Sequence, residues 1–162
     1  FRPGHFAGVI QVVKRLLDIV EPANLYMGQK DFQQFSIIKH MIRKLNLPVD
    51  LVMAPTVRAQ SGLAKSSRNE RLTPDNKDKA SVIYQTLLAA KKELGKKSIE
   101  DIKTDAIKRL DIPGFKPEYF DIVDGNSLQP VNDEKDSSWI VACTALWAGD
   151  VRLIDNMVLK EA

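Results

Sequence analysis

The stretch Met27-Gly28-Gln29-Lys30-Asp31-Phe32-Gln33-Gln34 decides the fold of the first half of the chain. It overlaps the short apolar run Leu25-Tyr26-Met27, which is typical of a buried strand. It leads into residues 35–45, where apolar side chains recur at helical spacing. A strand that ends at a glycine and passes into a helix is expected in an α/β fold, where a helix connects parallel strands.

The flanking segments extend this pattern in both directions. Residues 6–20 have the apolar spacing of an amphipathic helix, which Pro22 ends. Residues 49–54 predict a second strand just after Pro48. The helix–strand–helix–strand order implies a parallel sheet covered by helices. Two strands make a poor core, so we interpret them as half of a larger sheet.

The second half of the chain begins with helices. Thr73-Pro74 predicts a helix start, with Thr at the N-cap and Pro at the first helical position, and we expect this helix to run to Leu94. Gly95 is a plausible stop, and Ser98 is placed to cap a further helix.

The rest of the second half has the composition of strands. Aromatic and β-branched residues fill the runs 119–123, 139–147 and 151–159, and Gly149-Asp150 suits a tight hairpin turn between the last two. The polar, irregular residues 55–72 separate this α+β half from the first. We therefore expect two domains, 1–56 and 57–162, the second with a small, mostly antiparallel sheet.

Composition restricts the class of protein. Hydrophobic residues make up 44% of the 162 residues and charged residues 28%, which is ordinary for a soluble globular protein. No apolar run is as long as a membrane span, and the start of the sequence has no signal-peptide pattern. The single cysteine, Cys143, has no disulfide partner, and we expect its thiol to be buried. These features lead us to expect a cytoplasmic protein. A net charge of +3 does not indicate nucleic acid, and Lys91, Lys92, Lys96 and Lys97 are read as a solvated face or a binding patch.

The Gly28–Gln34 stretch has two readings. Ligands of open α/β sheets bind at the carboxyl ends of strands, helix starts attract anions, and Gly28 with Lys30 would suit a phosphate. Alternatively, Asp31 and Gln34 have the spacing of a capping box, and Gly28 is simply a turn residue. Spacing alone does not decide between them.

The loop Lys65-Ser66-Ser67-Arg68-Asn69 is a second candidate site. It brings together two hydroxyls, a guanidinium and an ammonium, which are hydrogen-bond donors suited to polyphosphate oxygens. A solvated polar loop is the alternative. The two histidines, His5 and His40, are far apart, so no zinc site is expected, and no Walker loop, dinucleotide fingerprint or nucleophile elbow is present.

Together these segments resemble the pantothenate synthetases, the pantoate–β-alanine ligase family. The matching runs are Arg2-Pro3-Gly4-His5-Phe6, Tyr26 to Gln34, Leu45-Asn46-Leu47-Pro48-Val49, Pro55-Thr56-Val57-Arg58, Gly62-Leu63-Ala64, Ser66-Ser67-Arg68-Asn69 and Val151-Arg152-Leu153-Ile154-Asp155-Asn156. They follow the family's order across nearly the whole chain. The resemblance implies that the chain is the C-terminal two-thirds of such an enzyme: residues 1–56 are the end of a Rossmann-like domain that binds ATP and pantoate, and residues 57–162 are a smaller lid domain.

The resemblance also implies roles for individual residues. The position matching Gln34 binds pantoate, and Val57 contacts the adenine side of the nucleotide pocket. Lys30 and Arg68 offset charge on the transferring phosphates, while Ser66 and Ser67 donate hydrogen bonds to the same oxygens. The ATP-binding positions are Gly28, Gln29, Lys30, Asp31, Val57, Lys65, Ser66, Ser67 and Arg68. The implied partners are ATP with Mg²⁺ on its phosphates, pantoate, β-alanine and a second copy of the chain, with no metal held by the protein, no nucleic acid and no membrane.

Three departures from the family pattern stand out. The family's H-x-G-H motif and one pantoate-binding glutamine belong upstream of Phe1, so we expect this chain alone to lack full activity. Residues 59–61 read Ala-Gln-Ser where the family usually has a Glu-Ala-Asp-like stretch, and Lys65 replaces a residue that is often hydrophobic. The rival interpretation is a non-catalytic fragment that only folds and dimerises.

Overall fold

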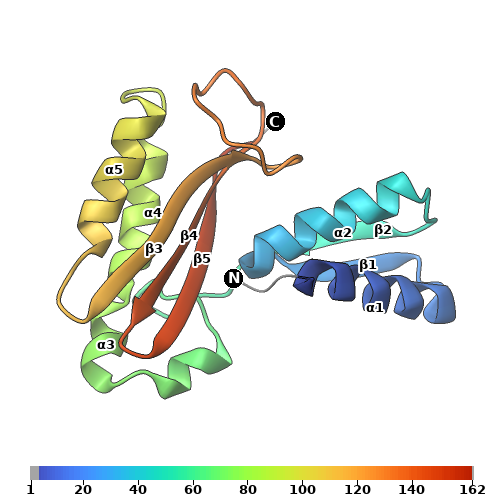
Figure 1. Cartoon of the computed structure of the whole chain (residues 1–162), viewed down its shortest axis with the longest axis horizontal. Coiled ribbons are helices and arrows are strands. Elements are labelled where there is room, and N and C mark those ends of the chain that lie inside the picture. Colours follow the sequence, from blue (N-terminus) through green and yellow to red (C-terminus); the bar gives the residue numbers. More distant parts are fainter. Residues whose placement is uncertain (1–3, 162) are drawn as a thin grey trace. The chain divides into compact units, whose positions relative to one another are not determined.

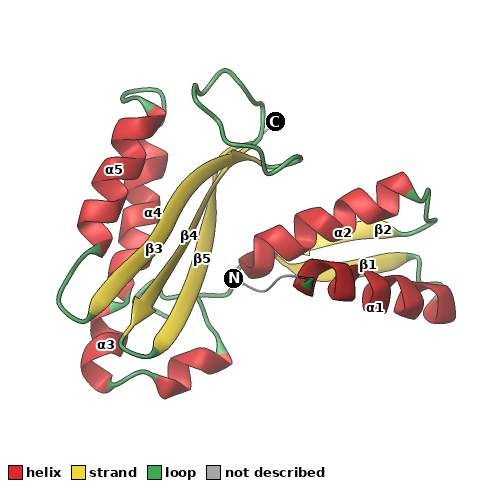
Figure 2. Cartoon of the chain, viewed as in Figure 1, coloured by secondary structure: helices red, strands yellow, loops and turns green. Residues whose placement is uncertain are grey.

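The chain divides into two compact units, Phe1–Pro55 and Thr56–Ala162. The structure is a computed structural model, and it describes residues 4–161. Arg2 and Pro3, which belong to the first matching run, lie outside the described residues. Helices and strands alternate along the first unit, and helices precede the sheet in the second. Figure 2 shows that both units contain helices and strands. The expected fold class, α/β followed by a small α+β part, is confirmed.

The first unit is built from two helices and two parallel strands. Its elements are α1 (His5–Val20), β1 (Asn24–Gly28), α2 (Phe32–Lys44) and β2 (Asp50–Ala54). A short 3₁₀ turn, η1 (Gln29–Asp31), joins β1 to α2. β1 and β2 are paired in parallel, with Leu25 opposite Leu51 and Gly28 opposite Ala54, so their carboxyl ends meet at one edge.

The core of this unit lies between the two helices and one face of the two strands. Leu17 of α1 and Ile38, Met41 and Ile42 of α2 are buried, and apolar side chains of β1 and β2 pack against them. The other face of the strands carries Tyr26 and is exposed: Tyr26 has 69% of its surface accessible. Within the described residues the strand pair therefore packs one face against the helices and exposes the other.

The second unit begins with three helices, α3 (Pro74–Lys79), α4 (Ser81–Glu93) and α5 (Ile99–Leu110). The predicted caps are present: Thr73 Oγ1 accepts a hydrogen bond from Asn76 N at 3.2 Å, and Ser98 Oγ accepts one from Asp101 N at 3.1 Å. The single helix expected up to Leu94 is wrong. Ala80 has ψ −13° and its carbonyl accepts a hydrogen bond from Ile83 N, three residues on, which tightens the backbone and separates α3 from α4.

A three-stranded antiparallel sheet completes the unit. The strands β3 (Phe115–Asp124), β4 (Ile140–Ala148) and β5 (Val151–Lys160) lie in the order β3-β4-β5. The predicted turn at Gly149-Asp150 joins β4 to β5, and Gly149 takes φ 58°, a left-handed conformation that favours glycine. Figure 1 shows α4 and α5 along one face of this sheet.

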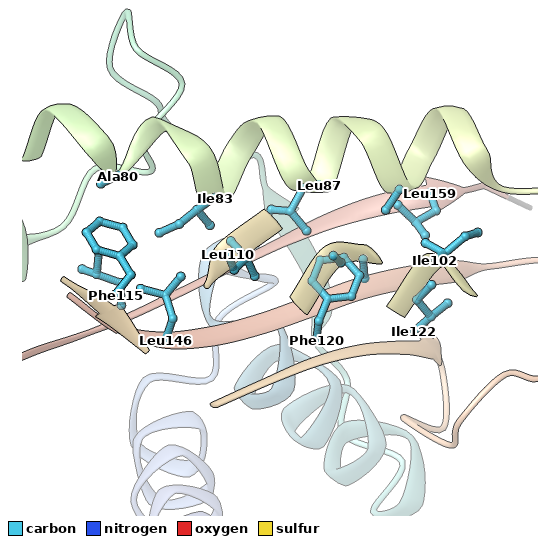
Figure 3. Packing of buried hydrophobic residues seen from close by; sticks show 14 of the residues in the cluster. Ala80, Ile83, Leu87, Ile102, Leu110, Phe115, Phe120, Ile122, Leu146 and Leu159 are labelled. Atoms are coloured by element: carbon cyan, nitrogen blue, oxygen red, sulfur yellow. The ribbon is translucent and has the colours of Figure 1, made fainter. Parts of the chain in front are cut away.

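The core of the second unit fills the space between these two helices and the sheet. Figure 3 shows side chains from the helices facing side chains from the strands across this layer. Leu87, Ile102, Leu110 and Leu146 are fully buried, and Phe120 is 2% exposed. This packing includes Leu153 and Leu159 and so holds β5 in the sheet.

We expect Leu87→Ala to destabilise the second unit by about 2–5 kcal/mol, because the side chain is fully buried and its loss leaves a cavity. Both tryptophans, Trp139 and Trp147, lie in this unit, so urea unfolding followed by their fluorescence measures the change. Gln85→Ala, an exposed position on the same helix, serves as the control and should shift stability by less than about 0.5 kcal/mol. Equal effects of the two changes would contradict this account of the core.

Candidate functional site

The β1–α2 junction does not contain the capping box that its spacing suggested. Asp31 occupies the N-cap of α2 with φ −93° and ψ 54°, and its side chain accepts no hydrogen bond from the helix. N-cap residues usually adopt extended angles, which let the side chain reach the first turn, and ψ 54° departs from them. The capping-box reading is therefore wrong.

Gly28 is not required by the shape of the turn either. Its φ of −68° and ψ of 133° are extended angles that any residue adopts. Apart from Gly28 itself and its two chain neighbours, no heavy atom lies within 4 Å of the position that a Cβ would take, so a side chain would meet open space there. A backbone without a side chain at this point leaves room for a ligand to approach closely.

The remaining first-unit candidates cluster around the same edge of the sheet. Gln29 and Lys30 are half-buried in η1, and Asp31 beside them is exposed. Gln34 is half-buried in the first turn of α2. The structure therefore brings Gly28, this turn and Gln34 together at the carboxyl end of β1, where open α/β sheets bind ligands.

The second-unit candidates begin on a small hairpin, residues 57–65. Lys65 N donates to Val57 O at 2.9 Å, Ala59 N donates to Leu63 O at 2.9 Å, and Arg58 pairs with Ala64 in an antiparallel bridge. Val57 has 65% of its surface accessible. The hairpin therefore joins the predicted adenine contact to the start of the predicted phosphate-binding loop.

The residues after the hairpin form an ordered turn. Ser66 caps the 3₁₀ helix η2 (Ser67–Arg71), its Oγ accepting from Arg68 N at 3.2 Å. Asn69 Nδ2 donates to Ala64 O at 2.9 Å and ties the turn back to the hairpin. The Ser66 hydroxyl uses an acceptor position in this contact, so its proton is still able to donate. The backbone is thus more constrained than in a plain solvated loop.

This turn presents exposed cations. Lys65, Ser67 and Arg68 are exposed. None of the ion pairs found between residues 4 and 161 includes Lys65 or Arg68. Two positive charges and two hydroxyls on an ordered backbone form an arrangement suited to a polyphosphate.

An ion pair that the sequence pattern did not predict joins the hairpin to β5. Arg58 Nη1 is 2.6 Å from Asp155 Oδ2, and Arg58 Nη2 is 3.1 Å from Asp155 Oδ1. The Asp155 side chain is 1% exposed and that of Arg58 is 17% exposed. The available signal was an aspartate within the apolar pattern of a strand, because a buried carboxylate requires a partner.

Other chemically active residues stand apart from these segments. His40 is exposed, and Cys143 is buried, which raises the pKa of its thiol to about 12. Lys97 forms ion pairs with Asp105 and Glu93, and the Asp105 contact raises its pKa, so part of the lysine-rich face is neutralised. Among residues 4–161, no group of His, Cys, Asp and Glu is placed to hold a metal, and no helix is long and apolar enough to cross a membrane.

Known proteins match almost the entire chain. The family model described as Pantoate-beta-alanine ligase matches residues 1–158. A pantothenate synthetase of Azobacteroides pseudotrichonymphae is 52% identical over 157 residues, covering 96% of this chain and 56% of that protein. One of Bacteroides thetaiotaomicron is 44% identical over 162 residues, covering 99% of this chain and 57% of that protein. The chain thus spans a little over half the length of these curated relatives.

Solved structures agree with the sequence comparisons. The crystal structure of pantothenate synthetase from Thermus thermophilus has a TM-score of 0.90 and 38% identity, over 98% of this chain and 58% of that one. Pantoate-beta-alanine ligase from Francisella tularensis, complexed with Beta-gamma ATP and beta-alanine, has a TM-score of 0.65 and 32% identity, over 98% of this chain and 52% of that one. The family model and these relatives show that the chain belongs to the pantoate-beta-alanine ligase family.

Proposed function

We propose that the complete protein carrying this chain joins pantoate to β-alanine at the expense of ATP. Pantoate's carboxylate attacks the α-phosphate of ATP, which forms pantoyl adenylate and releases pyrophosphate. The amine of β-alanine then attacks the acyl carbon, which forms pantothenate and releases AMP. Family membership supports this reaction, as does the Francisella relative complexed with Beta-gamma ATP and beta-alanine.

The observation that carries the proposal is the ordered turn at Lys65–Arg68. Its two cations have no carboxylate partner among the ion pairs found in the described part of the chain, and its backbone is fixed by the hydrogen bonds of Ser66 and Asn69. We assign Lys65 and Arg68 to the ATP phosphates, with Ser66 and Ser67 donating to the same oxygens. Preorganised donors of this kind stabilise charge that develops in a transition state.

The first unit supplies the remaining contacts in this proposal. Gly28, Gln29, Lys30 and Asp31 line the ATP side at the carboxyl end of β1, and Lys30 offsets phosphate charge. We assign Gln34 to pantoate. Its side-chain amide donates hydrogen bonds through NH₂ and accepts them through its oxygen, and a substrate with a carboxylate and hydroxyls requires both. No step needs a covalent nucleophile, so positioning and charge stabilisation account for the chemistry.

Magnesium accompanies ATP in this proposal, bound through its phosphates. Phosphate oxygens are hard ligands of the kind that Mg²⁺ prefers. The protein's contribution is then to orient the phosphates with Lys30, Lys65 and Arg68.

We also propose that the protein is a homodimer. α1 exposes apolar side chains: Leu16 is 54% exposed and Ile19 64%. Exposed apolar groups gathered on one helix are typical of an interface. Light scattering of the chain at micromolar concentration should give twice its 18.2 kDa mass, and Leu16→Glu should shift the mass towards that of the monomer. A monomer before the substitution would exclude this part of the proposal.

Lys30→Ala in the complete protein should lower the rate of AMP release on the order of a hundredfold or more, because a charge stabilising the transferring phosphate is lost. The melting temperature should change little, since replacing a partly exposed lysine alters stability by less than about 0.5 kcal/mol. Lys30→Arg should also lose much of the rate, because a planar guanidinium does not replace a compact ammonium. Lys44→Ala, at the exposed end of α2, is the control. Near-normal turnover of Lys30→Ala would remove Lys30 from the site.

Gln34→Ala should raise the KM for pantoate while leaving the KM for ATP within about twofold, since the amide contacts the acid substrate. Initial rates with each substrate varied in turn distinguish the two effects. Gln33→Ala, on the exposed neighbouring position, provides the comparison. An equal rise in both constants would argue against a pantoate contact.

A further inference from the structure

Four of the five N–H donors of the Arg58 guanidinium are engaged within the second unit itself. Its Nη1 donates to Gly62 O at 3.1 Å and to Asp155 Oδ2 at 2.6 Å. Its Nη2 donates to Asp155 Oδ1 at 3.1 Å and to Asn156 O at 3.2 Å. These four contacts use the four N–H groups on the two terminal nitrogens. Arg58 is therefore an anchor rather than a cation offered to a ligand.

Asp155 is the counterpart of this anchor on β5. Its carboxylate is 1% exposed, and Oδ1 also accepts a hydrogen bond from Asn156 N at 2.8 Å. A carboxylate buried to this degree is strongly disfavoured without a charged partner. The pair therefore fixes the base of the 57–65 hairpin to the last strand of the unit.

The tip of the hairpin is held against the same arginine. Arg58 Cζ lies 4.4 Å from the centre of the Tyr84 ring on α4, a cation–π contact. Gly62 at the tip takes φ 89°, and a Cβ added there would collide with the ring of Tyr84. The Tyr84 ring thus packs against both Arg58 and Gly62, at the base and at the tip of the hairpin.

We propose that the Arg58–Asp155 pair is a positioning pair for nucleotide binding: it holds the hairpin so that Val57 and the Lys65–Arg68 turn address the same ATP molecule. The proposal rests on the function assigned above. Val57 precedes Arg58 directly, and Lys65 N donates to Val57 O, so both ends of the hairpin move with the anchor. Neither Arg58 nor Asp155 needs to touch ATP.

The test is Arg58→Lys in the complete protein. An ammonium keeps the charge beside Asp155, but it does not reproduce the planar fork that reaches both carboxylate oxygens and two carbonyls. The KM for ATP should rise about tenfold while the KM for β-alanine stays within about twofold. Hydrogen exchange at the amides of Ala59 and Lys65 should accelerate about tenfold or more, and exchange at Leu146 in β4 should not change.

Arg152→Lys is the matched control. Arg152 lies on the same strand and also makes a two-armed pair, with Glu118, at 2.7 Å from Nε and 3.0 Å from Nη2. This change should leave the KM for ATP and the exchange of the hairpin amides as in the unaltered protein. Asp155→Asn keeps the shape of the anchor, and it should reproduce the effects of Arg58→Lys.

Four outcomes would overturn the positioning role. These are an unchanged KM for ATP in Arg58→Lys, an equal rise for both substrates, an equal effect of Arg152→Lys, or unfolding of both anchor variants, which would assign the pair to stability alone. Failure of the proposed function looks different. The unaltered protein would then release no AMP from ATP, pantoate and β-alanine, while hydrogen exchange would still show whether the pair holds the hairpin.

Discussion

The ion pair between Arg58 and Asp155 is the contact on which the candidate loop of the second unit depends. Removing one member of a buried pair costs on the order of 3–5 kcal/mol, because the other charge stays buried without a partner. The hairpin strands, the Gly62 turn and the Ser66 cap follow one another along the chain from this anchor. The buried Arg58–Asp155 ion pair therefore keeps the backbone of this loop ordered.

Basic residues in this region divide into two kinds. Arg58 directs its donors into the protein, where carbonyls and a carboxylate accept them. Lys65 and Arg68 are exposed and keep their charge towards solvent. The first kind fixes a backbone, and the second is available to a charged substrate. A cluster of positive charges in a sequence does not distinguish these roles, whereas burial and partners do.

Local patterns predicted the elements well, because periodicity, caps and turns depend on neighbouring residues. Thr73 and Ser98 cap their helices, and Gly149 turns the hairpin as expected. Predictions failed where backbone angles decide whether a residue caps or continues a helix. Asp31 lies at the start of α2 without capping it, and Ala80 interrupts an otherwise continuous helical pattern. The pairing of Arg58 with Asp155 was not predictable from spacing, since it joins distant segments. The roles of Lys30, Gln34 and Val57 came from family resemblance, and spacing left them open.

The distance along the chain between the two anchor residues bears on the order of folding. They are 97 positions apart, and Asp155 belongs to the last strand of the unit. During synthesis the hairpin leaves the ribosome before Asp155 does, so its arginine has no counter-charge until that strand has joined the sheet. Contacts between such distant segments form late because closing a long loop is entropically unfavourable. We therefore expect the loop that we propose to bind ATP to be among the last parts of the unit to become ordered, so that nucleotide affinity would report that this unit has finished folding.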